Sequence, residues 1–231
     1  MTPAVADLPR RGRVPPWLPL LVVVAAWLAQ GGVLRAGWVN DDVALVRDLP
    51  QARQGIRGVS AAFARDAWGG DVEPGVWRPL ALASLALEAP LWRGDDGQLA
   101  PGGFHLTNLL LHGFCGLLIL AVLLSVLGAG RWPWAAATAL LFVVHPLATG
   151  TIAAMGGRAD LLAGFFGLVA VLLWIRARKT PLLLPLVALA FFLALLAKET
   201  ILGLPWVLLL LDLSPAGRAA CGWVWGLSSR F

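Results

Sequence analysis

Two adjacent acids, Asp41 and Asp42, follow the first long apolar segment of this chain. Like charges side by side repel, and partial burial raises a carboxyl pKa, so such a pair is a candidate general base. The alternative interpretation is a solvated turn or helix cap, which is the usual setting of two aspartates after a helix. The choice between the two depends on which other polar groups the fold brings near the pair.

Three cations are expected near the outer membrane surface. Arg78 stands just ahead of Pro79 in the long loop, and Arg158 and Lys198 stand between later apolar runs. An arginine grips a phosphate through two parallel hydrogen bonds, and a lysine adds a compact point charge. A cavity that holds these cations near the two acids suits an anionic lipid head group and an acceptor hydroxyl. Each cation alone is also a common anchor at a membrane surface, so the set of three, rather than any single one, predicts a binding site for the phosphate.

One apolar segment carries a polar stripe. His105, Asn108 and His112 lie at positions i, i+3 and i+7, which fall within about 60° of arc on a helix. Polar groups that face lipid are costly, so this face is expected to point into the protein or into a wet cavity. There the three side chains either join neighbouring helices by hydrogen bonds or contact a substrate.

Three further polar residues complete the candidate cavity. His145 precedes Pro146, which frees a backbone carbonyl, and the histidine can serve either the resulting kink or a ligand. Asp160 and Glu199 stand beside two of the candidate phosphate-binding cations.

The elements that must position these residues are membrane helices. Hydrophobic residues make up 59% of the chain, charged residues only 13%, and the mean hydropathy is +0.78, values that exclude an ordinary soluble domain. Three arginines precede an uncharged run at 14–34, which is too long for a signal-peptide core and indicates a retained signal anchor. The two cysteines give neither a disulfide framework nor metal-ligand spacing. The net charge of +5 is a topology signal, not a nucleic-acid footprint.

The apolar runs predict an all-α polytopic bundle with about six spans, at 14–34, 104–127, 132–157, 161–175, 181–197 and 200–211. Five spans are the alternative, in which the last two runs fuse. A fused helix would be about 46 Å long, which overshoots the bilayer, and Gly203 and Pro205 also favour a break. The long first outer loop, 35–103, is expected to carry interfacial helices near 61–68 and 80–92.

The distribution of charge predicts the topology. With residues 1–13 in the cytoplasm, the inner segments hold nine basic and two acidic residues, whereas the outer segments hold nine basic and eleven acidic ones. The positive-inside rule therefore favours a cytoplasmic N-terminus, a transmembrane domain at 14–212 and a cytoplasmic tail at 213–231. The acid pair then lies on the outer side.

The order and spacing of several motifs resemble the transmembrane-and-tetratricopeptide O-mannosyltransferases and their bacterial relatives, which belong to the GT-C class of polytopic glycosyltransferases. The resemblance runs from about Trp38 to Asp212. It rests on these motifs: Asn40-Asp41-Asp42, Trp77-Arg78-Pro79-Leu80, Phe104-His105-Leu106-Thr107-Asn108 with His112, His145-Pro146, Gly157-Arg158-Ala159-Asp160-Leu161-Leu162, and Lys198-Glu199 with Pro205.

The resemblance implies that a mannose-like sugar passes from a polyprenyl-phosphate carrier to an acceptor hydroxyl, on a protein or glycan, outside the cytoplasm. It assigns the general base to Asp41 or Asp42. It implies that the cations Arg78, Arg158 and Lys198 stabilise the departing phosphate. No metal and no cofactor beyond the lipid-linked sugar are then required. The implied location is the plasma (inner) membrane of a bacterium, in contact with membrane lipid.

Two departures from the family leave alternatives open. The position four residues beyond Pro146, where the family has a glutamate, is Gly150. The family also continues with further spans and often with tetratricopeptide repeats, so the tail at 213–231 is expected to be truncated. A catalytically inactive fragment, or a module that only binds the lipid carrier, is therefore the alternative function. A transporter fragment is disfavoured because the charges lie at helix ends and not at mid-membrane. The motifs specify neither the sugar, nor the acceptor, nor the oligomeric state.

Overall fold

The computed structural model of the chain describes residues 13–39, 41–48, 53–64 and 77–214. Within these ranges the backbone is helical and contains no strand, and Arg93 and Leu99 form an isolated bridge. The expected all-α fold is thus confirmed. The helices that run along the bundle are α1 (Leu18–Gln30), α4 (Pro101–Leu127), α5 (Trp132–Val144), α6 (Leu147–Ala153), α7 (Arg158–Ala177), α8 (Leu184–Ala197) and α9 (Leu204–Leu213).

Proline fixes where most of these helices begin. A proline in the first turn loses no intrahelical hydrogen bond, and its fixed φ already suits a helix. The helices α1, α4, α5, α8 and α9 all have proline at the first or second position, as does α3 (Pro79–Glu88) outside the bundle. Short helices of three to five residues lead into α7, α8 and α9, at Met155–Gly157, Pro181–Leu183 and Glu199–Gly203.

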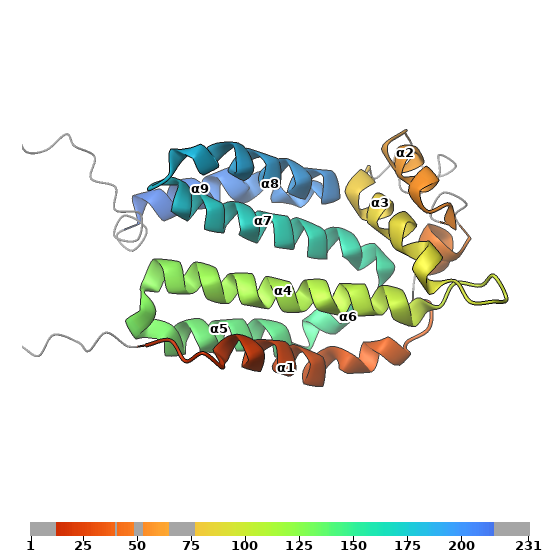
Figure 1. The fold of residues 1–231 in the computed structure, drawn as a ribbon, viewed down its shortest axis with the longest axis horizontal. Coiled ribbons are helices and arrows are strands. Elements are labelled where there is room, and N and C mark those ends of the chain that lie inside the picture. Colours follow the sequence, from red (N-terminus) through yellow and green to blue (C-terminus); the bar gives the residue numbers. More distant parts are fainter. Residues whose placement is uncertain (1–12, 40, 49–52, 65–76, 215–231) are drawn as a thin grey trace, which may run out of the picture.

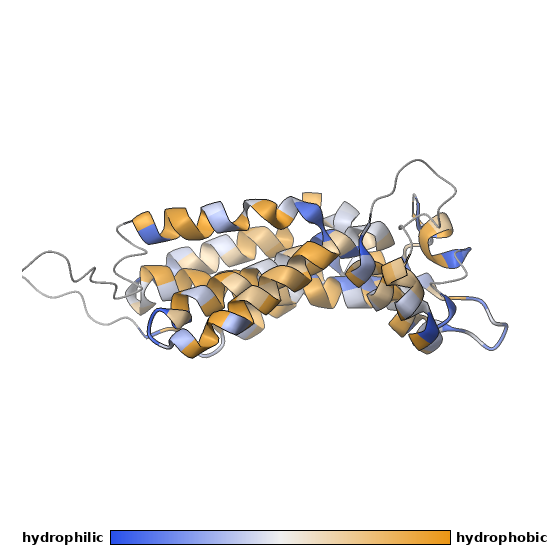
Figure 2. Ribbon diagram, turned by 90° about the horizontal axis from the view of Figure 1, so that it is seen from above, coloured by the Kyte–Doolittle hydropathy of each residue, from blue (hydrophilic) through white to orange (hydrophobic). Residues whose placement is uncertain are grey.

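The bundle has two halves joined by α4 and α7, which pack along each other (Figure 1). In one half α1, α4 and α5 enclose a core that includes Leu18, Val22 and Val143. In the other half α7, α8 and α9 enclose a core that includes Ala170, Val187 and Leu204. Figure 2 shows apolar residues along most of the bundle and more hydrophilic ones toward the end that carries α2 and α3.

The long first loop forms a helical cap at one end of the bundle (Figure 1). It contains a π-helical turn at Val43–Arg47, then α2 (Ile56–Ala64), α3 and the short helix Ala89–Trp92. Its core includes Leu82, Leu85 and Phe104. The expected helix at 80–92 is confirmed. The one expected at 61–68 instead begins at Ile56, and Trp68 lies outside the described residues.

The break expected at Pro146 is present, since α5 and α6 form a bent pair with an angle of 56°. In the described part of the chain three helices are long and apolar enough to cross a membrane, or four if the bent pair is one span. The chain is thus a multi-pass membrane protein. The expected fifth and sixth spans correspond to α8 and α9, which run along the bundle but are shorter, so the count of six stays a prediction.

Candidate functional site

The two adjacent acids have different surroundings. Asp42 is buried, and its carboxylate accepts hydrogen bonds from the backbone N–H of Val39 at 3.0 Å and of Met155 at 2.7 Å. Burial raises the pKa of Asp42, while these backbone hydrogen bonds oppose the shift. Asp42 therefore ties the start of the outer loop to the turn before α7. Asp41 is exposed, and its role as a base stays a prediction, while Asn40 lies outside the described residues.

Arg158 is the centre of a buried polar network. Only 1% of it is exposed, and its guanidinium donates to Glu88 at 2.5 Å, to the Phe104 carbonyl at 3.2 Å and to Asn108. Glu88 in turn accepts a hydrogen bond from Thr107 at 2.5 Å. The network joins α3, α4 and α7, and it engages each guanidinium nitrogen of Arg158. Its expected role as a phosphate ligand therefore stays a prediction.

Two ion pairs connect the ends of α3, α7 and α8. Arg78 donates to Glu199 at 3.2 Å, and Lys198 donates to Asp160 at 2.6 Å. In each pair the cation is the more buried partner, since the side chains of Arg78 and Lys198 are 25% and 17% exposed against 60% and 49% for their carboxylates. The pKa of Glu199 is lowered by its own backbone N–H and then by Arg78. The cations are thus held in place while their counter-ions face outward.

The polar stripe of α4 points into the protein. His105, Asn108 and His112 are all buried. His105 Nε2 lies 3.2 Å from the Gly37 carbonyl, and His112 Nε2 lies 3.2 Å from the Val143 carbonyl. The Asn108 amide donates to the carbonyl of Ile152, at the end of α6, and to that of Ala154, which follows α6. These contacts are to main-chain groups that the breaks between helices leave free, which favours the packing interpretation of the stripe.

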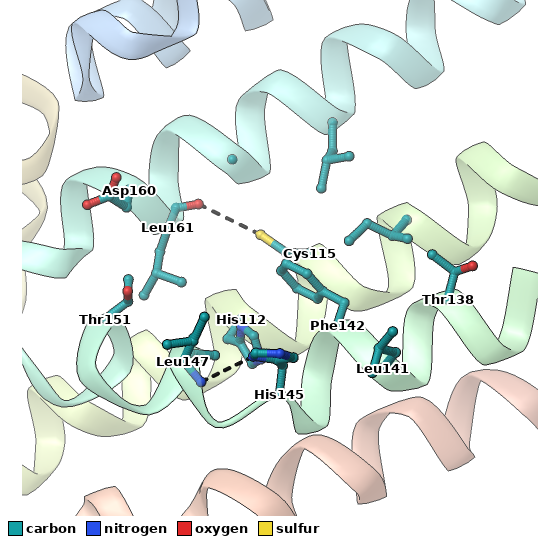
Figure 3. Close-up of a pocket in the computed structure, with 14 residues that line it drawn as sticks. His112, Cys115, Thr138, Leu141, Phe142, His145, Leu147, Thr151, Asp160 and Leu161 are labelled. Carbon is teal, nitrogen blue, oxygen red and sulfur yellow. Dashed lines mark hydrogen bonds between the residues drawn. The ribbon is translucent and has the colours of Figure 1, made fainter.

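A cavity of about 680 Å³ lies between α4, α5, α6 and α7 (Figure 3). Three of the expected cavity residues line it, namely His112, His145 and Asp160. The His112 ring stacks on Phe142 with the ring centroids 4.9 Å apart, and His145 Nδ1 accepts the Leu147 N–H. His105, Asn108 and Glu199 do not line this cavity, so the structure divides the expected set between a cavity and a region of buried or paired polar groups.

Glu88 is a site residue that sequence reasoning missed. It lies in the expected interfacial helix, where it is the one acid in the apolar run Leu80 to Trp92. Ser84 lies one turn earlier on the same face and accepts from Arg158 at 3.4 Å. The sequence signal that could have identified Glu88 is a single carboxylate in an apolar helix with a hydroxyl four residues earlier, since such a carboxylate is expected to have a buried partner. In the described ranges no group of three or more His, Cys, Asp or Glu side chains is placed to hold a metal ion.

Comparisons with known proteins identify relatives of this chain. It is 34% identical over 173 residues to protein O-mannosyl-transferase TMTC1 of Mus musculus, a match that covers 73% of this chain and 18% of the relative. It is 36% identical over 150 residues to Tmtc2 of Drosophila melanogaster, a match that covers 62% of this chain and 15% of that relative. It is 33% identical over 193 residues to Tmtc1 of the same fly, a match that covers 80% of this chain and 21% of that relative.

The chain therefore spans about a fifth of the length of these curated relatives, or somewhat less. No family model and no solved structure matches it.

Proposed function

Because this chain is related in sequence to the TMTC protein O-mannosyl-transferases, we propose that it is a membrane glycosyltransferase of the GT-C class. It moves a mannose-like sugar from a polyprenyl-phosphate carrier to an acceptor hydroxyl on a protein or glycan. The observation that carries this proposal is the grouping of Arg78 and Lys198, each more buried than its carboxylate partner, at the helix ends beneath the cap.

The reaction needs one bond formed and one broken. The acceptor oxygen attacks the anomeric carbon of the sugar, and the bond from that carbon to the carrier phosphate breaks. The acceptor proton passes to a carboxylate, and the electron pair of the broken bond stays on the phosphate. The departing polyprenyl phosphate is already a good leaving group at neutral pH, so a general acid is not required, and positive charge near the phosphate oxygens stabilises the transition state.

The residues divide these tasks as follows. Asp41 is the base, because its exposed carboxylate can reach a hydroxyl, whereas Asp42 is held by two backbone N–H groups and positions its neighbour. Arg78 and Lys198 bind the phosphate after it displaces Glu199 and Asp160 from them. These cations supply the positive charge, so the proposal includes no metal and no cofactor.

Arg158 supports the site from within the protein, since its donors bind Glu88, Asn108 and the Phe104 carbonyl. We propose that Arg158 holds α3 in place, and that α3 in turn positions Arg78 at its first turn.

We further propose that the site faces away from the cytoplasm in the inner membrane of a bacterium. The excess of basic residues in segments on the N-terminal side supports a cytoplasmic N-terminus. The start of α1 and the end of α9 lie at one end of the bundle, and the cap lies at the other (Figure 1).

A second candidate function is a module that binds the lipid carrier without turnover. The observation that favours it is Gly150 in α6, which takes the place of an expected glutamate. A Cβ at Gly150 would meet nothing within 4 Å, so close packing does not explain the glycine. Gly150→Glu fits without a clash at its Cβ and is the variant that separates the two functions, because it supplies the missing carboxylate.

The test is sugar transfer from polyprenyl-phosphate-linked mannose in membranes that contain the chain. Asp41→Asn should lower the rate by about 10²–10⁴-fold, the usual contribution of a general base, while donor binding stays close to that of the parent chain. Asp96→Asn, which makes the same chemical change in the exposed turn near Gly97, serves as the matched control and should leave the rate unchanged. Unchanged transfer by Asp41→Asn would remove the base assignment. Transfer that appears only in Gly150→Glu would identify the parent chain as the binding module.

A further inference from the structure

The segment that leads from α1 into the acid pair packs against the first turns of α4. The ring of Trp38 lies beside that of Phe104, with the centroids 6.2 Å apart. A Cβ built at Gly102 would lie 2.9 Å from the carbonyl oxygen of Leu34, so the glycine lets the two backbones approach closely. The chain just before the acid pair is therefore held against α4.

His105 of α4 adds a directed hydrogen bond to this packing. Its side chain is fully buried, and Nε2 lies 3.2 Å from the carbonyl oxygen of Gly37. A carbonyl oxygen can only accept, so Nε2 carries the hydrogen. Nδ1 is buried and has no hydrogen-bond partner among the described residues. In that part of the chain the ring therefore makes its hydrogen bond to Gly37 alone.

The other side of the acid pair is held by Asp42. Its carboxylate accepts the N–H groups of Val39 and of Met155, which precedes α7. Asp41 lies between this attachment and the one at α4, and its own carbonyl accepts the Leu45 N–H at 2.9 Å. The backbone that carries the Asp41 carboxylate is thus fixed from both sides.

We propose that His105 is a positioning residue for the acid pair. Through the Gly37 carbonyl it sets the place of Asp41, and so the reach of that carboxylate toward an acceptor hydroxyl. The inference rests on the proposed function, in which Asp41 is the base, and adds a side chain that acts on the base through the backbone. A misplacement of about 1 Å can lower a catalytic rate about 10²-fold, so the loss of this one bond should be measurable.

Three substitutions of His105 separate its hydrogen bond from the volume of its ring. His105→Gln places an amide N–H close to the position of Nε2 and can still donate to Gly37. His105→Asn carries the same amide on a shorter side chain, which ends near the position of Nδ1, and His105→Leu has no donor. His112→Leu is the matched control, because His112 is also buried on α4, with Nε2 3.2 Å from the Val143 carbonyl.

The first measurement is hydrogen exchange, read by mass spectrometry on the purified full chain in detergent micelles. It follows peptides that cover residues 36–42, where the amides of Ala36, Val39 and Asp42 are hydrogen bonded. His105→Leu and His105→Asn should exchange about tenfold faster there than the parent chain, because a buried carbonyl loses its donor. His105→Gln should exchange at close to the parent rate, and His112→Leu should leave these peptides unchanged.

The second measurement is sugar transfer from polyprenyl-phosphate-linked mannose. His105→Leu should lower kcat about 10²-fold. The KM for the donor should stay close to that of the parent chain, because the proposed phosphate contacts are those of Arg78 and Lys198. His105→Gln should restore most of kcat and keep the pH profile of the parent chain, since it keeps the hydrogen bond and loses only the ionisable ring.

Three results would overturn the inference. Equal exchange of residues 36–42 in His105→Gln and His105→Leu would show that the hydrogen bond does not hold the segment. Equally fast exchange in His112→Leu would indicate a general loosening of the fold. A pH profile altered by His105→Gln would show that the ring acts through its own proton. Absence of transfer in the parent chain would instead remove the proposed function, and hydrogen exchange would still decide whether His105 fixes the segment.

Discussion

At the scale of single residues, Glu88 and Arg158 form a buried ion pair between α3 and α7. The two side chains are 10% and 1% exposed, and their charged groups lie 2.5 Å apart. Glu88→Gln leaves the guanidinium buried without a counter-charge, which typically costs about 3–5 kcal/mol. We expect this loss in the free energy of unfolding, measured by chemical denaturation in detergent micelles.

Glu199→Gln is the matched control, because it makes the same chemical change in an exposed pair, where about 0–1 kcal/mol is at stake. The double variant Glu88→Leu/Arg158→Met should recover most of the loss, since apolar residues of similar size often replace a buried pair without cost. If Glu88→Gln proves no more destabilising than Glu199→Gln, the pair does not hold α3 on the bundle.

The second residue-scale prediction concerns pH. Burial raises the folded-state pKa of Asp42 above its usual 3.8, so the folded chain binds a proton there more tightly than the unfolded chain. The stability from this group is fully present below the unfolded pKa and is lost as pH rises through the raised one. We therefore expect the parent chain to gain stability relative to Asp42→Asn when the pH is lowered from about 7 toward about 4.

The quantity to measure is the difference in free energy of unfolding between the parent chain and Asp42→Asn, because other groups also change the stability of each protein with pH. Glu199 has a lowered pKa, so its contribution is present at neutral pH and falls as the pH drops, opposite to that of Asp42. Glu199 is present in both proteins and its effect cancels. A stability difference that stays constant over the pH range would contradict a raised pKa of Asp42 in the folded chain.

At the scale of elements, the break between α5 and α6 depends on Gln30 of α1. The break frees backbone carbonyls, and the Gln30 amide donates to those of Val143 at 3.4 Å and His145 at 3.1 Å. The Gln30 carbonyl accepts from Thr149 at 2.7 Å. One side chain thus satisfies groups on both sides of the bend, and only 2% of it is exposed.

Gln30→Leu removes these partners while keeping a similar volume. It should destabilise the chain by about 1–3 kcal/mol, the cost of buried polar groups left unsatisfied, measured as a shift in the denaturation midpoint. Leu28→Ala, on the same helix at a site 83% exposed, should have little effect on the same measurement. Equal midpoints for Gln30→Leu and the parent chain would show that water or another group takes over the role of Gln30.

The elements were largely predictable from the sequence, because prolines and uncharged runs mark where membrane helices begin and how far they extend. The break at Pro146 and the start of α3 at Pro79 follow from that pattern. The start of α2 at Ile56 does not, because no proline marks it. The pairings were not predictable. The sequence places Arg158 at a phosphate, but its carboxylate partner is 70 residues away in a helix with an apolar pattern. Spacing within one helix gives no information on which helix lies opposite.

At the scale of the whole molecule, the arrangement of the helices predicts which segments lie on opposite sides of the membrane. The cap with α2 lies at one end of the bundle, and the turn between α7 and α8 lies at the other (Figure 1). Ser60 in α2 and Thr180 in that turn are both exposed. A single cysteine at either position should therefore react with a reagent that cannot cross the membrane only from its own side.

The measurement uses Ser60→Cys and Thr180→Cys in a background in which Cys115 and Cys221 are replaced by alanine. With the cap outside, intact cells should be labelled at position 60 and not at position 180, and inverted membrane vesicles should show the reverse. The parent background without added cysteine controls for other reactive groups. Labelling of both positions from one side would contradict the arrangement itself, whereas a reversed pattern would keep the helices and turn the candidate site toward the cytoplasm. That result would remove the extracytoplasmic acceptor while leaving the contacts of Arg78 and Lys198 as they are.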